Sequence, residues 1–502
     1  MTSLALSAAD PRSERTRAPT LGLPALLALG IGCTALAGNR FNVALVGWVA
    51  AVPWLLALRQ LRGGRAWTGF FVALQLGTFL NILKIVTDPI PVVFVPMFSV
   101  PTALGASVAY ALFEALRRRL GDGWGLLLFP ALTVVLEALS FSTSDLGSWG
   151  SLAYTQLDNL PLLQVTSLFG ITAVSALLSL VSATVAVLIA RPDRARFLPA
   201  AVAVTALVAL AHGYGSVRLD RVLDGPTVEV ATVTTDLHLG DGGFPQASER
   251  AAGTDQLFAR TVQAVEAGAE VVVWNEGATA VDPADEPAFL ARAATFTAEH
   301  GVDVLFAYVV PLAAGPYRYE NKYVWMTPEG PLETYLKHHP VPGEGAVPGT
   351  GPLVAHPRPY GVAAGAICYD YDFPAMSKEH AAAGVGLALV PSSDWRGIDP
   401  YHSQMAAVRG IEGGYSVVRS VRWATSQATD ALGRVRGTAS YFEGDRVMVA
   451  SVPTTRVTTL YSRVGEVLPL AGLLVVFAGV AMAFARARSG SPTRQGPSRA
   501  QS

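Results

Sequence analysis

A cysteine, a glutamate and a lysine of this sequence have the side chains needed for acyl transfer through a thioester. Cys368 is one of only two cysteines and ends the apolar run 362–368. Glu276 ends a second apolar run, 270–276, and Lys337 lies between the two runs. A thiol can form the thioester, a carboxylate can accept its proton, and an ammonium can stabilise the negative charge that develops on a carbonyl oxygen. We therefore expect these three residues to form a catalytic constellation.

The region that must position them, residues 226–455, alternates short β-rich runs with helical stretches. Active-site groups of layered α/β folds favour the ends of strands, where the strand fixes the backbone and the following loop stays accessible. Glu276 directly follows such a run, so its position fits this rule. The expected strands are 228–234, 271–274, 302–310, 322–326 and 387–390, and the expected helices are 256–267, 286–299 and 401–413.

The rest of the chain is typical of a membrane protein. The sequence is 51% hydrophobic and only 15% charged, with a mean hydropathy of +0.38, whereas soluble domains carry roughly 25% charged residues. Most of its apolar segments approach or exceed the roughly 18 residues expected of a membrane-spanning helix. The segments lie at 21–38, 42–58, 66–86, 92–116, 124–142, 164–190, 197–213 and 465–485.

These segments predict five regions: an N-terminal tail (1–20), seven transmembrane helices (21–213), the α/β domain (226–455), an eighth helix (465–485) and a disordered tail (486–502). Arginines cluster after the second, fourth and sixth segments and in the C-terminal tail. By the positive-inside rule these exits and both termini are cytoplasmic, which places the α/β domain outside the cytoplasm. The first segment could instead be a cleaved signal peptide, and the domain would lie outside in either case.

Several classes of function are disfavoured by composition and spacing. The net charge of −1 offers no basis for nucleic-acid binding. Two cysteines cannot build a disulfide framework, and Cys33 lies in an apolar stretch, so Cys368 is expected to be free. The sequence contains no metal-ligand spacing and no phosphate-binding glycine loop, so we expect neither a metal nor another cofactor.

The segments around the three residues resemble the catalytic motifs of the nitrilase, or carbon-nitrogen hydrolase, superfamily. These segments are Trp-Asn-Glu276, Tyr-Leu-Lys337-His-His-Pro-Val-Pro and Ile-Cys368-Tyr-Asp. The stretch 391–397, which contains Trp395, and the stretch 405–412 are similar to the two motifs that follow the cysteine. With apolar helices on both sides, the chain most resembles the apolipoprotein N-acyltransferase family, the membrane branch of that superfamily.

This resemblance implies a multi-pass α-helical membrane protein with an extracytoplasmic nitrilase-like αββα sandwich. It implies that Cys368 takes an acyl chain from a phospholipid and passes it to the amine of a diacylglyceryl-cysteine at the N-terminus of an apolipoprotein. Glu276 would be the general base, and Lys337 would hold the oxyanion. Glu344 matches a second family glutamate that positions the lysine, and Tyr369 follows the cysteine as in the family. The implied location is the bacterial plasma membrane.

The sequence also departs from the family pattern at several points. Cys368 follows Lys337 by only 31 positions, Glu344 is shifted by one position, and Asp370 stands where a glutamate is usual. Arg422-Trp423 replaces a small, polar, glycine-containing stretch. These differences leave open a membrane-anchored amidase, in which water resolves the thioester, and a non-catalytic membrane scaffold.

Overall fold

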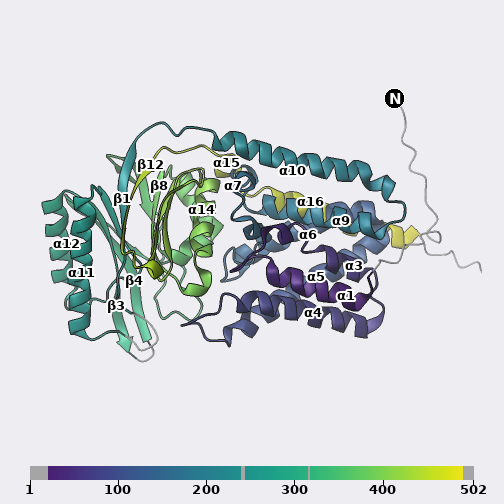
Figure 1. Ribbon diagram of the computed structural model, residues 1–502, viewed down its shortest axis with the longest axis horizontal. Helices are drawn as coiled ribbons and strands as arrows, with labels where there is room; N and C mark the ends of the chain where they lie inside the picture. The colour runs from purple at the N-terminus through teal and green to yellow at the C-terminus, as the bar shows by residue number, and fades with distance from the viewer. Residues whose placement is uncertain (1–20, 239–243, 315–316, 490–502) are drawn as a thin grey trace, which may run out of the picture.

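The computed structural model describes residues 21–238, 244–314 and 317–489 and has two parts (Figure 1). Helices of the N-terminal region and the last helix form a bundle, and residues 227–453 form an α/β domain at one end of it. The two predicted tails lie outside the described residues, except that the last helix continues to Ser489, past the predicted boundary at residue 485.

The bundle contains six helices that are long and apolar enough to cross a membrane, counted over the described residues. They are α4 (Gly63–Leu83), α5 (Phe94–Leu120), α6 (Asp122–Thr143), α9 (Thr172–Ala190), α10 (Leu198–Leu219) and α16 (Leu468–Ser489). The first two predicted segments form shorter helices, namely α1 (Leu23–Leu36), α2 (Ala44–Gly47) and α3 (Val52–Leu58). The total of eight crossings therefore remains a prediction.

The predicted segment 164–190 is interrupted near its start. The short helix α8 (Thr166–Phe169) ends at Gly170, whose φ of 75° lies in the left-handed region, and α9 begins two residues later. A side chain at Gly170 would also collide with the ring of Tyr461, since a Cβ atom there would lie 2.6 Å from Cε2. Similar short elements lie at the domain end of the bundle: the 3-10 turn Leu152–Gln156, α7 (Leu160–Leu163) and α15 (Tyr461–Val464). A further 3-10 turn, Arg194–Phe197, joins α9 to α10 at the other end.

The outer surface of the bundle is apolar. Large hydrophobic side chains are exposed along α10, among them Val202 and Leu210, and along α16, among them Leu474 and Phe477. Water-soluble proteins rarely expose apolar surface on this scale, whereas lipid chains solvate it. The bundle is therefore the membrane-embedded part of the protein.

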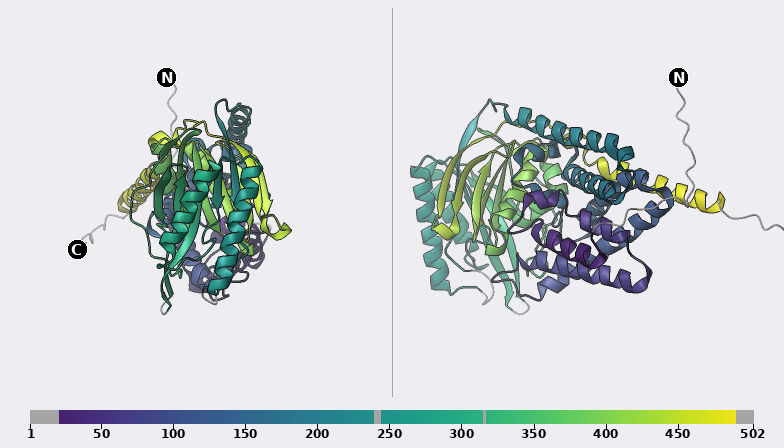
Figure 2. Two further views of the ribbon diagram at one scale, coloured as in Figure 1. Left: turned by 90° about the vertical axis from the view of Figure 1, so that its left-hand side faces the viewer. Right: turned by 45° about the vertical axis from the view of Figure 1, so that its right-hand side comes forward.

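One end of the bundle is held together by a buried acid. Asp122, at the start of α6, pairs with Arg59 at 2.6 Å, with Arg117 at 2.9 Å and with Arg191. These arginines follow or end α3, α5 and α9, and Arg486 of α16 donates to a carbonyl oxygen at the same end. The arginine-rich segments that follow the second, fourth and sixth predicted membrane segments thus meet at a single end of the bundle, opposite the α/β domain (Figure 2).

Over the residues that the structure describes, the α/β domain contains two six-stranded sheets. The first has the order β12-β1-β2-β3-β4-β5 and the second β11-β10-β9-β8-β7-β6. The strands of the first sheet are β1 (Thr227–Val233), β2 (Val271–Trp274), β3 (Asp303–Ala314), β4 (Tyr317–Thr327), β5 (Gly330–Leu336) and β12 (Val447–Pro453). Those of the second are β6 (His356–Arg358), β7 (Gly361–Gly365), β8 (Leu387–Ser393), β9 (Ser416–Arg422), β10 (Thr425–Thr429) and β11 (Val435–Ser440).

Helices cover the outer face of each sheet, so the domain is an αββα sandwich, as predicted. Helices α11 (Ala247–Glu266) and α12 (Glu286–His300) cover the first sheet and lie farthest from the bundle. Helices α13 (Pro374–Ala382) and α14 (Tyr401–Gly413) cover the second sheet, and α14 lies between that sheet and the bundle (Figure 1). The extracytoplasmic position of the domain remains a prediction.

Parallel strands near the centre of each sheet are buried along almost their whole length. Every residue of β2 is buried, and β2 pairs in parallel with β1 and β3. In the second sheet β8 pairs in parallel with β7 and β9. Strands covered on both faces read as continuous hydrophobic runs, which is why the run before Glu276 could be recognised. The ends of β2, β7 and β8 carry the candidate site.

Candidate active site

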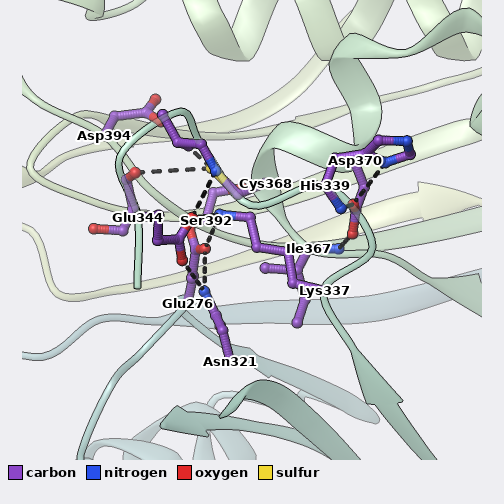
Figure 3. Close-up of polar contacts among 12 residues, drawn as sticks. Glu276, Asn321, Lys337, His339, Glu344, Ile367, Cys368, Asp370, Ser392 and Asp394 are labelled. Carbon is purple, nitrogen blue, oxygen red and sulfur yellow. Dashed lines mark hydrogen bonds and ion pairs between the residues drawn. The ribbon is translucent and has the colours of Figure 1, made fainter. Parts of the chain in front are cut away.

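The sequence-predicted residues lie where strands end. Glu276 follows β2, Lys337 directly follows β5, and Cys368 follows β7. All three are buried, with 6%, 1% and 3% of their surface exposed, respectively. Figure 3 shows the side chains of Glu276, Lys337 and Glu344 pointing toward one another, with Cys368 beside them. The structure therefore brings the predicted acid, lysine and thiol together.

Lys337 is held between two carboxylates. Its Nζ donates to Glu276 Oε1 at 2.7 Å and to Glu344 Oε2 at 2.8 Å. Burial disfavours the ammonium, but the charges of Glu276 and Glu344 outweigh burial and raise the pKa of Lys337 well above its ordinary value. Burial also works against the charge on Glu344, yet Lys337 lowers the pKa of that carboxyl. The lysine therefore remains charged and fixed in position.

Two residues that the sequence analysis did not single out complete this cluster. Asn321 of β4 donates through Nδ2 to Glu276 Oε1 at 2.7 Å and to Glu344 Oε1 at 2.9 Å. The hydroxyl of Tyr319 donates to Glu344 Oε1 at 3.1 Å. These bonds fix the orientation of both carboxylates without bringing a second positive charge to them. Tyr319 and Asn321 are alternate residues of β4. Because alternate residues of a strand point to the same face, both side chains can reach Glu344.

The backbone at Cys368 is strained. Its φ of 47° lies in the left-handed region, which non-glycine residues rarely occupy and which costs on the order of 1–3 kcal/mol. The residue begins the 3-10 turn Cys368–Asp372. Asp370 stabilises this turn by accepting bonds from the backbone N–H of Ile367 at 3.0 Å and the hydroxyl of Tyr335 at 2.8 Å. Asp370 thus supports the turn that presents the thiol.

A second charge cluster, absent from our sequence analysis, lies on another side of the sulfur. Nη2 of Arg419 lies 3.7 Å from Cys368 Sγ, and Asp394 Oδ1 lies 4.0 Å from it. Arg419 also donates to both carboxylate oxygens of Asp394, at 2.7 and 3.0 Å. The guanidinium is therefore both a neighbour of the thiol and one half of a buried ion pair.

His402 extends this cluster. Its Nδ1 lies 2.8 Å from Asp394 Oδ1, and its Nε2 lies 2.9 Å from Asp372 Oδ1. Burial and the charge of Arg419 oppose protonation of the imidazole, but the two carboxylates outweigh them and raise the pKa of His402. The histidine joins the residue after β8 to the last residue of the cysteine turn.

The thiol itself is protonated at rest. Burial raises the pKa of Cys368 well above its ordinary value, and the negative charge of Glu276 adds to this effect. The positive charges of Arg419 and Lys337 act in the opposite direction but do not overcome it. Because the thiolate is the nucleophile, a base must remove the proton during reaction. Glu276 is the carboxylate of the predicted set that can do so.

A cavity of about 240 Å³ adjoins these residues. Its polar wall includes Glu276, Lys337, Glu344 and Ser393, and its other walls carry aromatic side chains. Trp395, which the resemblance singled out, lines this cavity. The carbonyl oxygen of Ser393 lies 3.7 Å from Cys368 Sγ, so the thiol is immediately behind that wall. The cavity is the space in which a substrate carbonyl can meet the site.

Three potential metal ligands also occur here. The sulfur of Cys368, a carboxylate oxygen of Asp394 and a ring nitrogen of His402 lie within 4.8 Å of one another. Arg419 contacts all three of these residues. Because this guanidinium supplies the positive charge that a metal ion would supply, we interpret the group as an ion-pair cluster.

The cysteine turn is bonded directly to the membrane part. The hydroxyl of Tyr369 donates to the carbonyl oxygen of Asp145 at 2.8 Å. The backbone N–H of Ser148 donates to the carbonyl oxygen of Asp372 at 2.8 Å, and Nε1 of Trp149 donates to its carboxylate at 2.8 Å. The loop 144–149 after α6 therefore holds both ends of the turn that carries Cys368.

The missed residues carried only a weak signal in the sequence. Arg419 interrupts the buried run Ser-Val-Val-Arg-Ser-Val of β9, and a charge inside a buried strand indicates a buried partner. Asp394 directly precedes the motif residue Trp395, and His402 lies at the start of a predicted helix. Nothing in the one-dimensional pattern indicates that these three residues meet beside Cys368.

Comparison with known proteins gives two family matches. Residues 31–184 match the family described as apolipoprotein N-acyltransferase N-terminal domain, and residues 242–461 match the carbon-nitrogen hydrolase family. The chain is similar to an apolipoprotein N-acyltransferase of Geobacter metallireducens, with 26% identity over 89% of this chain and 92% of the relative. An apolipoprotein N-acyltransferase of Caulobacter vibrioides is 30% identical over 57% of this chain and 59% of the relative.

Among solved structures, an amidase from Nesterenkonia sp. is similar, with a TM-score of 0.37 and 18% identity over 46% of this chain and 93% of that chain. Nit3 of Saccharomyces cerevisiae has a TM-score of 0.39 and 17% identity over 49% of this chain and 96% of that chain. The two family matches cover the bundle and the α/β domain in the expected order. The chain therefore belongs to the apolipoprotein N-acyltransferase family, a membrane branch of the carbon-nitrogen hydrolases.

Proposed function

We propose that this protein transfers an acyl chain from a phospholipid, through a thioester on Cys368, to the N-terminal amine of a diacylglyceryl-cysteine apolipoprotein. The observation that carries the proposal is a buried, protonated thiol beside a Glu276–Lys337 pair, on a turn bonded to the loop that follows the membrane helix α6. Family membership supports the same reaction.

In the first half-reaction Glu276 accepts the Sγ proton as the thiolate attacks the ester carbonyl carbon of the phospholipid. Lys337 Nζ stabilises the resulting oxyanion. When the tetrahedral intermediate collapses, the ester C–O bond breaks and the leaving alkoxide takes the proton from Glu276. The products are a lysophospholipid and an acyl thioester on Cys368.

In the second half-reaction the amine of the acceptor attacks the thioester carbonyl. Glu276 accepts a proton from the amine nitrogen, and the C–S bond breaks with the electron pair returning to sulfur. The proton then passes from Glu276 to the thiolate, which restores the resting thiol. The net reaction exchanges an ester for an amide, and it needs neither a metal nor a redox cofactor to balance.

Both substrates carry acyl chains, which accounts for the attachment of the site to the bundle. Transfer of each methylene group from an apolar environment into water costs about 0.8 kcal/mol, so a site at the membrane avoids extracting either lipid. Trp395, on the cavity wall, donates to the carbonyl oxygen of Ile85 at 2.5 Å, just beyond the end of α4. The cavity thus adjoins the membrane part as well as the cysteine.

The test follows both half-reactions by intact mass. Purified protein in micelles is incubated with phospholipid, and an acyl adduct is expected on Cys368. Addition of a diacylglyceryl peptide with a free amine should move the adduct to the peptide. Release only as free fatty acid would instead establish a hydrolase, and a lipid-bound protein without any adduct would establish a scaffold. Cys368→Ala should abolish the adduct, whereas Cys33→Ala serves as the matched control.

We further propose that the α/β domain lies outside the cytoplasm of a bacterial cell and that the Asp122 end of the bundle faces the cytoplasm. The convergence of the arginine-bearing exits at one end supports this orientation. Exposed cysteines introduced in a Cys33→Ala background, as Thr295→Cys in α12 and Arg62→Cys before α4, report the side. A membrane-impermeant maleimide should label the first but not the second in intact cells, and the reverse pattern would overturn the orientation.

A further inference from the structure

His402 is a buried imidazole that bridges two acids from different elements. It is the second residue of α14, the helix between the second sheet and the bundle (Figure 1), and it is 3% exposed. Its Nδ1 lies 2.8 Å from Asp394 Oδ1, and its Nε2 lies 2.9 and 3.0 Å from the two carboxylate oxygens of Asp372. Asp394 follows β8, whereas Asp372 ends the turn that begins at Cys368.

One end of this bridge lies beside the sulfur. Asp394 Oδ1 is 4.0 Å from Cys368 Sγ, and a ring nitrogen of His402 lies within 4.8 Å of the same sulfur. Arg419 is the third charged group here, with its Nη2 2.8 Å from His402 Nδ1 and 3.0 Å from Asp394 Oδ1. At such short distances in a buried site, a small redistribution of charge within the cluster changes the stability of the thiolate.

The other end of the bridge lies on the membrane side. Nε1 of Trp149 donates to Asp372 Oδ2 at 2.8 Å, and the indole ring lies 5.3 Å from the imidazole ring of His402. Trp149 belongs to the loop 144–149 that follows the membrane helix α6. The side chains of Trp149, Asp372, His402 and Asp394 therefore form one chain of polar contacts from this loop to the nucleophile.

Neither acid depends on His402 alone for its position. The backbone carbonyl of Asp372 already accepts bonds from the N–H and the hydroxyl of Ser148, at 2.8 and 2.7 Å. The carboxylate of Asp394 already accepts bonds from two nitrogens of Arg419. The contribution that only His402 makes is the connection between the two carboxylates.

We propose that His402 is a positioning residue that couples the loop 144–149 to the reactivity of Cys368. The inference rests on the proposed function in taking Cys368 as the nucleophile, and it adds how the membrane part influences that nucleophile. Hydrogen bonds in a chain polarise one another. Without the indole donor, Asp372 draws more strongly on His402, and the charge of Asp394 then acts more fully on the sulfur. Loss of the bond from Trp149 therefore destabilises the thiolate.

The experiment measures alkylation of Cys368 by iodoacetamide over a range of pH, followed by intact mass in a Cys33→Ala background in micelles. Trp149→Phe removes the indole donor but keeps an aromatic ring. It should slow alkylation at a given pH about fivefold, because part of a charge-assisted hydrogen bond is transmitted to the sulfur. Loosening of the fold would instead expose the thiol and speed alkylation, so a slower rate is not explained by lost stability.

The same measurement is repeated with Trp149→Phe in proteins that already contain His402→Asn or His402→Gln. Asparagine places its amide nitrogen near the position of Nδ1 and can keep the bond to Asp394, whereas glutamine places it near Nε2 and can keep the bond to Asp372. Either change interrupts the chain, so Trp149→Phe should alter the rate by less than about twofold in both. One folded variant of the two is sufficient, and thermal unfolding identifies it.

Trp54→Phe is the matched control, because it removes an indole bond to Thr34 elsewhere in the bundle. It should leave the alkylation rate unchanged. Equal slowing by Trp149→Phe with and without the histidine would show that the loop acts through the backbone of the turn, and this would overturn the proposal. An unchanged or faster rate in Trp149→Phe alone would overturn it as well.

These outcomes are distinguishable from a failure of the proposed function. Alkylation of Cys368 needs no lipid, so the coupling can be measured whether or not acyl transfer occurs. A wild-type protein that is alkylated but takes no acyl chain from phosphatidylethanolamine would count against the proposed function. Additive effects of Trp149→Phe and the histidine variants on alkylation would count only against the role of His402.

Discussion

Arg419 and Asp394 lie at nearly equal distances from the nucleophilic sulfur, and this symmetry leads to a quantitative prediction. The guanidinium is 3.7 Å from Cys368 Sγ and the carboxylate oxygen is 4.0 Å from it. With an effective dielectric constant of about 20, either charge alone changes the energy of a thiolate by about 4 kcal/mol, with opposite signs. Together they nearly cancel, so neutralising one of them should matter far more than neutralising both.

The variant Arg419→Met leaves the carboxylate of Asp394 beside the sulfur without its cation. The thiolate then becomes less stable by about 4 kcal/mol, which corresponds to a roughly thousandfold smaller thiolate fraction at a given pH. The double variant Arg419→Met/Asp394→Asn removes both charges and should return to within about threefold of the wild type. Thioester formation should follow the same order among the three proteins.

The assay is alkylation of Cys368 by iodoacetamide at fixed pH, followed by intact mass in a Cys33→Ala background. Removing one partner of a buried ion pair destabilises proteins by about 3–5 kcal/mol, so thermal unfolding is recorded for each variant to confirm that it is folded. A folded Arg419→Met protein that is alkylated as fast as the wild type would refute the reasoning. So would a double variant as slow as the single one.

Three further predictions concern other parts of the site. Lys337→Met should slow thioester formation by about 10²–10³-fold, as expected for the loss of an oxyanion donor, and a smaller effect on the adduct measured by mass would remove Lys337 from that role. Trp149→Phe removes the indole bond to Asp372 and should lower the free energy of unfolding by about 1–3 kcal/mol, measured by denaturant titration in micelles; no change would mean that the loop does not hold the turn. Burial raises the pKa of Glu412 to about 7 despite Arg409, so the folded state binds a proton that the unfolded state releases near pH 4.5. The stability this contributes is present below pH 4.5 and is lost as pH rises toward 7, and Glu412→Gln should flatten that part of the thermal unfolding profile, whereas a parallel profile would contradict the assignment.

The sequence was sufficient to predict the αββα sandwich and the positions of Glu276, Lys337 and Cys368. The reason is local: each lies at or just beyond an apolar or β-rich run, in a motif of neighbouring residues. Glu344 could be matched despite its one-residue shift because it lies close to Lys337 in the sequence. These residues meet because parallel strands of packed sheets bring their ends together.

The cluster of Arg419, Asp394 and His402 could not be predicted in the same way. Its members belong to separate elements, and their partners are set by the packing of α14 against the second sheet. The same limit applies to the interruption at Gly170, which depends on its contact with the distant residue Tyr461. Hydropathy indicates an apolar run but does not record where a ring from another part of the chain occupies the space.

The bonds from the loop 144–149 to the cysteine turn have a consequence for modularity. The two family matches suggest an anchor and an enzyme that evolution or engineering could recombine. The nucleophile, however, lies on a turn whose last residue, Asp372, accepts hydrogen bonds from the anchor at both its backbone carbonyl and its carboxylate. A chimera that fuses this α/β domain to a foreign anchor would leave the backbone carbonyl of Asp372 without these donors. The smallest transferable unit therefore includes this loop, and the boundary of the enzyme lies inside the membrane part.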